Sequence, residues 1–267
     1  MFLYPPNKLS AGTLTRSCNI ILKEKIERSG SPPFTRNFYY IWTKNVLYCM
    51  NRYPVFFLMA TLFQFSTITM KAQDTGRFDG EVQRLIQQRD SLQLTAPILF
   101  VGSSTIRMWR WLPEDFPEAA ILNMGFGGSQ MSDLLHYAEL LVVPARPGKI
   151  FIYEGDNDIA ASKALCRIMR ETRRLLRLLD QELASVPIVL ISAKPSPSRW
   201  DKQKKYKKLN RRMEKLCERH SALSYADTWG IMLDEQGRPR ADIFLEDQLH
   251  MNRKGYKLWA EALRPFL

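Results

Sequence analysis

Apolar and polar residues follow two different periods along the chain between residue 81 and its end. Five segments with apolar residues at helical spacing predict amphipathic helices over residues 81–94, 131–142, 164–183, 200–220 and 252–263. Short, continuous apolar runs of strand length alternate with them, at residues 97–101, 121–123, 150–153, 187–192 and 223–226. Strands that are apolar on both faces are typical of a parallel sheet covered by helices on both sides. The pattern therefore predicts an α/β protein, a three-layer α/β/α sandwich around a five-stranded parallel sheet.

The N-terminal part of the chain has a different pattern, with one apolar run over residues 55–65. The run follows Arg52, and polar residues interrupt it and follow it. It is shorter than the stretch of about 20 apolar residues that crosses a bilayer, which favours a secretory signal over residues 50–73. An uncleaved membrane tether through residues 50–70 is the alternative.

A signal that begins at residue 50 disagrees with a protein start at residue 1, because a secretory signal normally begins at the first methionine. Met50 is the methionine with which the predicted signal begins, so we interpret it as the true start of the protein. Residues 1–49 are then a mis-assigned or disordered extension. Residues 74–267 are then the mature domain. The expected location is periplasmic or secreted, or, with an uncleaved tether, membrane-anchored with the domain outside the cytoplasm.

Positive charge is concentrated in the N-terminal part and on two predicted helices. The chain has a net charge of +12, and its first 72 residues hold nine basic and two acidic residues. Within the domain, basic residues gather over residues 167–177 and 202–219. The simpler interpretation is a solvated helix face, and an acidic surface or polyanion as partner is the alternative. Without zinc-finger spacing or a series of stacking aromatics, we expect no nucleic acid as partner.

The four cysteines do not indicate a metal site. They include no CxxC pair and no nearby histidine at ligand spacing, so no metal is expected. Cys166 and Cys217 lie in helical patterns and are interpreted as small core residues rather than as a disulfide pair. A single disulfide remains the alternative if the protein is exported.

Short polar motifs follow three of the predicted strands, and a fourth precedes the last predicted helix. They are Gly102-Ser103-Ser104, Asn123-Met124-Gly125-Phe126-Gly127-Gly128, Gly155-Asp156-Asn157-Asp158 and Asp247-Gln248-Leu249-His250. Ligands of parallel α/β sheets bind at the carboxyl ends of the strands, so we expect the motifs to meet at one sheet edge. The proline-rich loop 194–199, after the fourth predicted strand, is expected to border the same site.

The first and last motifs predict a nucleophile and its base. A serine hydroxyl is a weak nucleophile and needs a base, usually a histidine that a carboxylate holds in place. Ser104 follows a glycine turn, and His250 follows Asp247 by three positions, which lets the carboxylate reach the imidazole. The spacing of Asp247 and His250 is common, and by itself it also fits a surface pair.

The same motifs contain donors for a developing oxyanion, namely the backbone amides of Ser104 and Gly128 and the side-chain amide of Asn157. Each such donor contributes roughly 100- to 1,000-fold to the rate. A simple tight turn at Gly128 and a turn cap at Asn157 are the alternatives. A dinucleotide site is disfavoured because Gln130 stands where a third glycine is needed.

In order, spacing and position at strand ends, the four motifs resemble the blocks of the SGNH hydrolases, also called GDSL lipases or esterases. The resemblance spans about residues 97–260 and rests on one residue from each block, Ser104, Gly128, Asn157 and His250. It implies a flavodoxin-like fold and catalysis without metal or cofactor. The absence of a GxSxG motif separates the chain from the α/β-hydrolases.

The resemblance also implies roles for these residues. Ser104 attacks the ester, His250 acts as general base and then as general acid, and Asp247 orients His250. The amides of Ser104, Gly128 and Asn157 form the oxyanion hole.

Two residues depart from the family pattern. Ser103 stands where the family has an aspartate, which leaves two serines as candidate nucleophiles, and Ser104 occupies the family's serine position. Glu154 precedes the third block where a small or apolar residue is expected. We interpret Glu154 as facing solvent or pairing with an arginine, and an electrostatic effect on the catalytic histidine is the alternative.

The predicted function is an exported serine esterase that cleaves carboxylic esters of a carbohydrate, lipid or small molecule. No long insertion follows any motif, which predicts an open site and favours short acyl or acetyl groups over long chains. Trp109, Trp111 and Phe126 lie near the motifs and either line this site or belong to the core. The alternative function is a catalytically silent carbohydrate- or lipid-binding protein on the same fold.

Overall fold

The computed structural model describes residues 76–184 and 186–267. The predicted extension over residues 1–49 and the predicted signal or tether over residues 50–73 therefore lie outside the described residues. Within the described residues, no helix has both the length and the apolar character of a membrane span.

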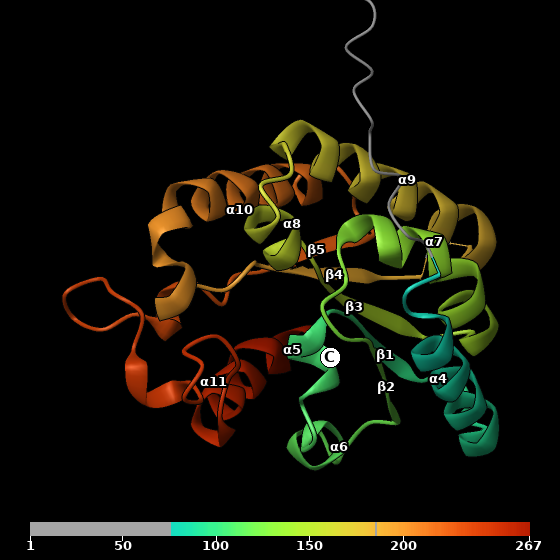
Figure 1. Ribbon diagram of the computed structural model, residues 1–267. Helices are drawn as coiled ribbons and strands as arrows, with labels where there is room; N and C mark the ends of the chain where they lie inside the picture. The colour runs from blue at the N-terminus through green and yellow to red at the C-terminus, as the bar shows by residue number, and fades with distance from the viewer. Residues whose placement is uncertain (1–75, 185) are drawn as a thin grey trace, which may run out of the picture. The chain divides into compact units, whose positions relative to one another are not determined.

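Five parallel strands form one sheet at the centre of the domain (Figure 1). Their order across the sheet is β2-β1-β3-β4-β5. The strands are β1 (Ile98–Gly102), β2 (Ile121–Gly125), β3 (Lys149–Tyr153), β4 (Ile188–Ile191) and β5 (Leu223–Ala226). The predicted fold class is confirmed, and each strand begins or ends within two residues of its predicted bounds.

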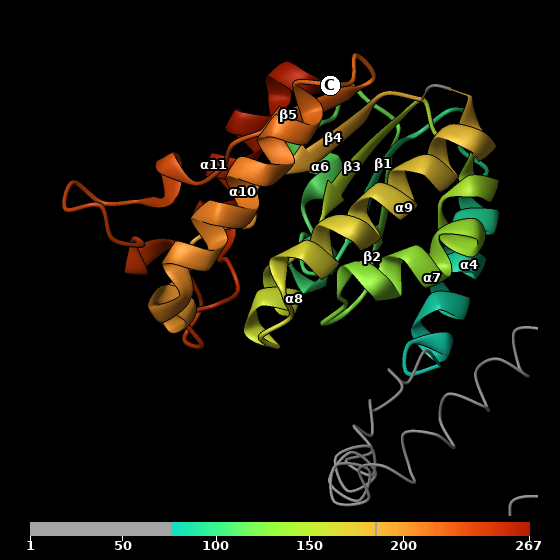
Figure 2. The same ribbon diagram turned by 90° about the horizontal axis from the view of Figure 1, so that it is seen from above.

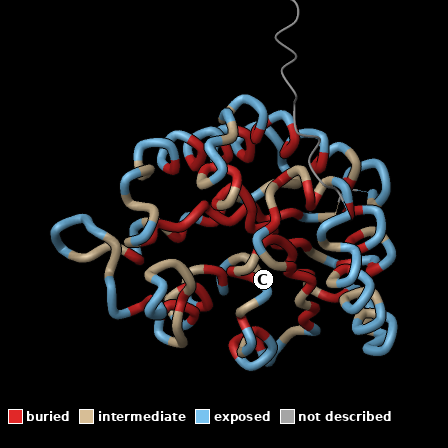
Figure 3. The backbone as a smooth tube through the Cα atoms, in the orientation of Figure 1, coloured by how far each residue is buried: buried red, intermediate tan, exposed pale blue. Residues whose placement is uncertain are grey.

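Helices cover both faces of the sheet and bury it between two apolar clusters (Figures 1 and 3). One face packs against α4 (Asp79–Leu92), α7 (Met131–Leu141), α8 (Asp156–Ala160), α9 (Leu165–Leu183) and α10 (Gln203–Cys217). The other face packs against α5 (Ser104–Arg107), α6 (Leu112–Asp115) and α11 (Arg253–Leu263). Alternate residues of each strand point to opposite faces, so β1 gives Leu99 and Val101 to one cluster and Phe100 to the other.

The helices differ from the predicted ones where the chain turns at the carboxyl edge of the sheet. The short helices α5, α6 and α8 have too few residues for a periodic pattern, so the sequence does not reveal them. The helix predicted from residue 200 begins at Gln203, after a 3₁₀ segment over Pro197–Lys202. Four further 3₁₀ segments of the described residues are also too short for a periodic pattern, at Val143–Ala145, Gly230–Met232, Ala241–Ile243 and Arg264–Phe266.

The two described cysteines are free, and only one lies in the core. Cys217 is buried as predicted, whereas Cys166 is exposed, so the prediction of a core position is wrong for Cys166. Cys166 precedes the buried Ile168 by two positions, which is about 200° around a helix, and it therefore points away from the sheet.

Candidate active site

A glycine turn at the end of β1 presents Ser104. Gly102 has a φ of +139°, and a Cβ atom there would lie 2.0 Å from the carbonyl oxygen of Tyr153 on the neighbouring strand. Only glycine allows this approach. The amide of Ser103 donates to the same carbonyl over 3.1 Å, and α5 begins at the next residue. Ser104 thus stands at the carboxyl edge of the sheet, at the start of a short helix.

The structure brings together three side chains that the sequence assigns to a triad. The Oγ of Ser104 lies 3.0 Å from the Nε2 of His250, although 146 residues separate them. The Nδ1 of His250 lies 2.5 Å from the Oδ2 of Asp247. Ser103 is buried at the N-terminal end of α5, and its side chain makes no capping hydrogen bond. The imidazole therefore faces Ser104 and not Ser103.

Backbone amides hold the second oxygen of the Asp247 carboxylate. Its Oδ1 accepts hydrogen bonds from the amides of Leu249 and His250, each 2.9 Å long. Partial burial opposes ionisation of Asp247, but the bonds from His250 and from these amides outweigh it and lower its pKa to about 2. Asp247 is therefore a carboxylate under all but strongly acidic conditions.

The predicted oxyanion donors lie at the same edge, on the first residue of α5, on the loop after β2 and in the first turn of α8. Gly128 has a φ of +70°, and nothing lies within 4 Å of a Cβ atom built there, so its surroundings are open. The amide of the preceding Gly127 is occupied, because it donates to Glu81 over 3.0 Å. Among the described residues, the amides of Ser104 and Gly128 have no acceptor. Both remain available to a ligand.

Two neighbours fix the orientation of the Asn157 side chain at the start of α8. Its Nδ2 donates to the carbonyl of Ser129 over 2.9 Å, and its Oδ1 accepts from the Nη2 of Arg199 over 3.1 Å. The guanidinium can only donate, which determines which end of the amide is nitrogen. One Nδ2 hydrogen is then free for a substrate.

Arg199 belongs to a buried charged cluster around Asp156 that sequence reasoning missed. The Asp156 carboxylate pairs with the guanidinium of Arg199 and lies 3.1 Å from the Nζ of Lys194. It also accepts hydrogen bonds from the hydroxyls of Tyr153 and Tyr206. Burial opposes ionisation, but Lys194 and Arg199 outweigh it and hold the pKa of Asp156 below its usual range. The one available signal was the position of loop 194–199 after β4.

Glu154 is not on the surface, so the prediction that it faces solvent or pairs with an arginine is wrong. Its side chain is 1% exposed and accepts a hydrogen bond of 2.5 Å from the Oγ of Ser129. Its other oxygen has no partner among the described residues. Burial, and then the charge of Asp158, raise the pKa of Glu154 well above its usual range. The cause is its place at the end of the central strand β3, beneath the loop that carries Gly128.

The aromatic residues near the motifs lie mostly in the core. Trp109 and Phe126 are 1% and 0% exposed, so neither lines an open site. Trp111 is half-buried, with the guanidinium of Arg253 5.0 Å from its ring centre. Within residues 76–184 and 186–267, no group of three or more His, Cys, Asp or Glu side chains is arranged to hold a metal ion.

Solved structures of GDSL lipases and esterases share this fold. A GDSL-like lipase from Bacteroides thetaiotaomicron is 18% identical, with a TM-score of 0.61 over 69% of this chain and 96% of its own. A lipase/acylhydrolase from Enterococcus faecalis is 21% identical, with a TM-score of 0.52 over 63% of this chain and 94% of its own. An acetylxylan esterase from Geobacillus stearothermophilus is 17% identical, with a TM-score of 0.53 over 62% and 92%.

Sequence comparison assigns the family. No curated protein sequence matches the chain significantly. The family model of the GDSL-like lipases and acylhydrolases matches residues 100–258, which include all five predicted site residues. The chain therefore belongs to the GDSL-like lipase/acylhydrolase family and is a hydrolase that acts on ester bonds.

Proposed function

We propose that this protein is an exported serine esterase that removes short acyl groups, above all acetyl, from a carbohydrate, lipid or small molecule. The distance of 3.0 Å between the Oγ of Ser104 and the Nε2 of His250 carries the proposal. A histidine that hydrogen-bonds a serine on one side and a carboxylate on the other is the arrangement that activates a serine nucleophile.

The reaction proceeds in two steps. In the first, the Nε2 of His250 takes the proton of Ser104 while its Oγ bonds to the ester carbonyl carbon. His250 then gives that proton to the leaving alcohol oxygen, which leaves an acyl group on Ser104. In the second, His250 takes a proton from water, the water oxygen attacks the acyl carbon, and Ser104 regains a proton from His250. The products are an alcohol and a carboxylic acid.

In this proposal, the oxyanion of both tetrahedral intermediates accepts hydrogen bonds from the amides of Ser104 and Gly128 and from the Nδ2 of Asn157. The first two amides lack an acceptor among the described residues, and Asn157 is held by Ser129 and Arg199. Donors that are already oriented need no reorganisation when the charge develops, and each is worth about 10²–10³ in rate.

Preference for a short acyl group is supported by the sequence and by one structural relative. No long insertion follows the motifs, and the acetylxylan esterase with the same fold acts on acetyl esters of a carbohydrate. Export is supported by the apolar run over residues 55–65, outside the described residues.

The test is hydrolysis of p-nitrophenyl acetate and p-nitrophenyl laurate by the full-length chain. We expect faster turnover of acetate, loss of activity by at least about 10⁴-fold in Ser104→Ala, and a rate close to wild type in the matched neighbour Ser103→Ala. Faster laurate turnover would contradict the short-acyl proposal. An inactive but folded wild type, or activity that survives Ser104→Ala, would contradict the catalytic one.

A further inference from the structure

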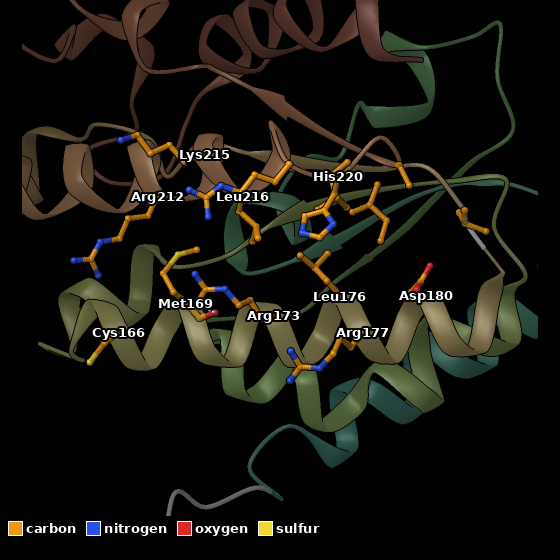
Figure 4. A pocket seen from close by; sticks show the side chains of 15 residues that line it. Cys166, Met169, Arg173, Leu176, Arg177, Asp180, Arg212, Lys215, Leu216 and His220 are labelled. Carbon is orange, nitrogen blue, oxygen red and sulfur yellow. Dashed lines mark hydrogen bonds between the residues drawn. The ribbon is translucent and has the colours of Figure 1, made fainter.

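The two basic stretches of the sequence lie side by side on the face of the sheet that α9 and α10 cover (Figure 2). A cleft with a volume of about 690 Å³ runs between these two helices (Figure 4). This volume is within the range of about 300–1,000 Å³ that is usual for small-molecule sites. The cleft reaches the first residues of β4 and β5, Ile188 and Leu223, whereas Ser104 lies two residues past the last residue of β1. It therefore differs from the candidate active site.

The floor of the cleft is apolar. Met169 and Leu176 of α9, Leu216 of α10 and Ile188 of β4 line it, and each is less than 10% exposed. They belong to the core cluster beneath the two helices. An alkyl chain laid along this floor would lose its contact with water on one side without disturbing a polar group.

The rim of the cleft is cationic and lacks ion pairs. Five basic side chains line it, and none of them forms a salt bridge with a described residue: Arg173, Arg177, Arg212, Lys215 and Arg219. Asp180 is the one carboxylate among the lining residues. Figure 4 shows Arg173 and Arg177 on α9 and Arg212 on α10, with the apolar side chains of Met169, Leu176 and Leu216 between the two helices. The site thus carries excess positive charge beside an apolar strip.

We propose that this cleft binds a single-chain anionic amphiphile of the fatty-carboxylate class. Its alkyl chain lies on the floor between α9 and α10, and its carboxylate meets the guanidinium groups of the rim, which suit bidentate pairing. A polyanion would contact the charged rim but would not cover the apolar floor. A neutral lipid would cover the floor but would not pair with the charges of the rim. The site performs no chemistry and does not depend on the esterase proposal.

Binding of decanoate to the full-length chain, measured by isothermal titration calorimetry, tests the proposal. Acetate carries the charge without the chain, and decyl maltoside carries the chain without the charge. We expect decanoate to bind at least about tenfold more tightly than either, and its affinity to fall as salt is added. Equal binding of decanoate and decyl maltoside would overturn the charged rim, and equal binding of decanoate and acetate would overturn the apolar floor.

Two double variants with matched charge locate the ligand. Arg173→Gln/Arg212→Gln removes two rim charges and is expected to weaken decanoate binding about tenfold. Arg174→Gln/Arg211→Gln removes the neighbouring exposed charges, which do not line the cleft, and should leave binding unchanged. Equal effects of the two pairs would mean that a diffuse basic surface attracts the ligand. If the chain also bound anionic phospholipid vesicles, and both pairs of substitutions affected that binding equally, the ligand would be a membrane surface instead.

The wild-type chain offers a second readout that needs no variant. Cys166 is exposed and lines one end of the cleft, whereas burial raises the pKa of Cys217 to about 11 and keeps it unreactive. Decanoate should slow alkylation of Cys166 by iodoacetamide, measured by peptide mass spectrometry with Cys217 as internal reference. Saturating decanoate that leaves this rate unchanged would place the ligand elsewhere and overturn the proposal.

Discussion

At the scale of single residues, the side-chain amide of Asn157, a proposed oxyanion donor, has partners that lie outside the four sequence motifs. Arg199 and Ser129 hold the two ends of the amide, and Arg199 is itself held by the buried carboxylate of Asp156. Arg199 touches no reacting atom in this arrangement. In the proposed mechanism it is a positioning residue, whose effect on the reaction passes through Asn157.

This dependence predicts non-additive kinetics for Arg199 and Asn157. Asn157→Ala removes one oxyanion donor and should lower kcat by about 10²–10³-fold. Arg199→Met frees the amide to rotate and should lower kcat about tenfold with little change in KM, because the donor acts mainly in the transition state. The double variant should be no slower than Asn157→Ala. Additive losses, measured with p-nitrophenyl acetate, would mean that Arg199 acts through something else.

Glu154 provides a second prediction at this scale, on stability against pH. In the unfolded chain its carboxyl ionises near 4.5, whereas burial keeps it protonated well above that value in the folded protein. The folded state therefore binds more protons, and the contribution of Glu154 to stability is full below pH 4.5 and is lost as pH rises through the raised pKa.

Glu154→Gln does not titrate, so its stability relative to wild type should improve between pH 5 and pH 8. The difference in Tm between variant and wild type should shift by on the order of 3 °C in favour of the variant, the effect of about 1 kcal/mol in a domain of this size. Thermal unfolding at both pH values measures it. The exposed Glu182→Gln serves as control, and an equal Tm difference at both pH values would refute the prediction.

At the scale of elements, Asn252 joins the loop that carries Asp247 and His250 to α11. Its Oδ1 accepts hydrogen bonds from the amides of Lys254 and Gly255, which makes it the N-cap of that helix. Its Nδ2 donates to the carbonyls of Asp242 and Phe244, in and directly after the 3₁₀ segment Ala241–Ile243 that precedes the Asp247–His250 loop. One side chain thus ties the loop that carries His250 to a helix packed on the sheet.

Replacing this residue separates its two roles. Asn252→Ala loses the cap and the loop bonds and should destabilise the protein by about 1–2 kcal/mol, or a Tm shift of about 2–8 °C. Asn252→Asp keeps the capping oxygen, so it should lose less. The exposed Lys254→Ala is the control. An unchanged Tm in Asn252→Ala, measured by calorimetry, would show that the cap is not needed.

At the scale of the whole molecule, the described residues carry two separate surfaces for which we propose functions. The candidate active site lies at the carboxyl edge of the sheet, where β1, β2 and β3 end. The basic cleft lies between α9 and α10 on one face. Because their residues do not overlap, variants of one surface are expected to leave the other unchanged.

Export is a further prediction at this scale. It rests on the sequence of residues 50–73, which lie outside the described residues. In a Gram-negative host, we expect the protein in the periplasm or medium, with an N-terminus near residue 74. N-terminal sequencing of the purified protein measures this. An intact segment over residues 50–70 in the membrane fraction would instead support the tether, and soluble protein with residue 1 intact in the cytoplasm would contradict both.

The sequence by itself determined the elements, the fold class and the family. Hydrophobic periodicity reports the buried face of each long helix and strand, and it is local, so the strands and helices appear in the sequence close to their observed bounds. The four motifs likewise predicted Ser104, Asp247 and His250 as one group, and the structure places them within hydrogen-bond distance of one another. Short helices such as α5 and α8 were not predicted, because four or five residues are too few for a pattern of 3.6 residues per turn to repeat.

Only the tertiary structure decided which distant side chains meet. Three partners of Asp156, namely Lys194, Arg199 and Tyr206, lie 38 to 50 residues further along the chain. Glu154 is buried because β3 is the central strand of the sheet. The separate basic stretches share one cleft because α9 and α10 cover the same face. Packing brings together groups whose distance in sequence carries no signal, so partners and burial of polar residues follow from the fold rather than from any local pattern.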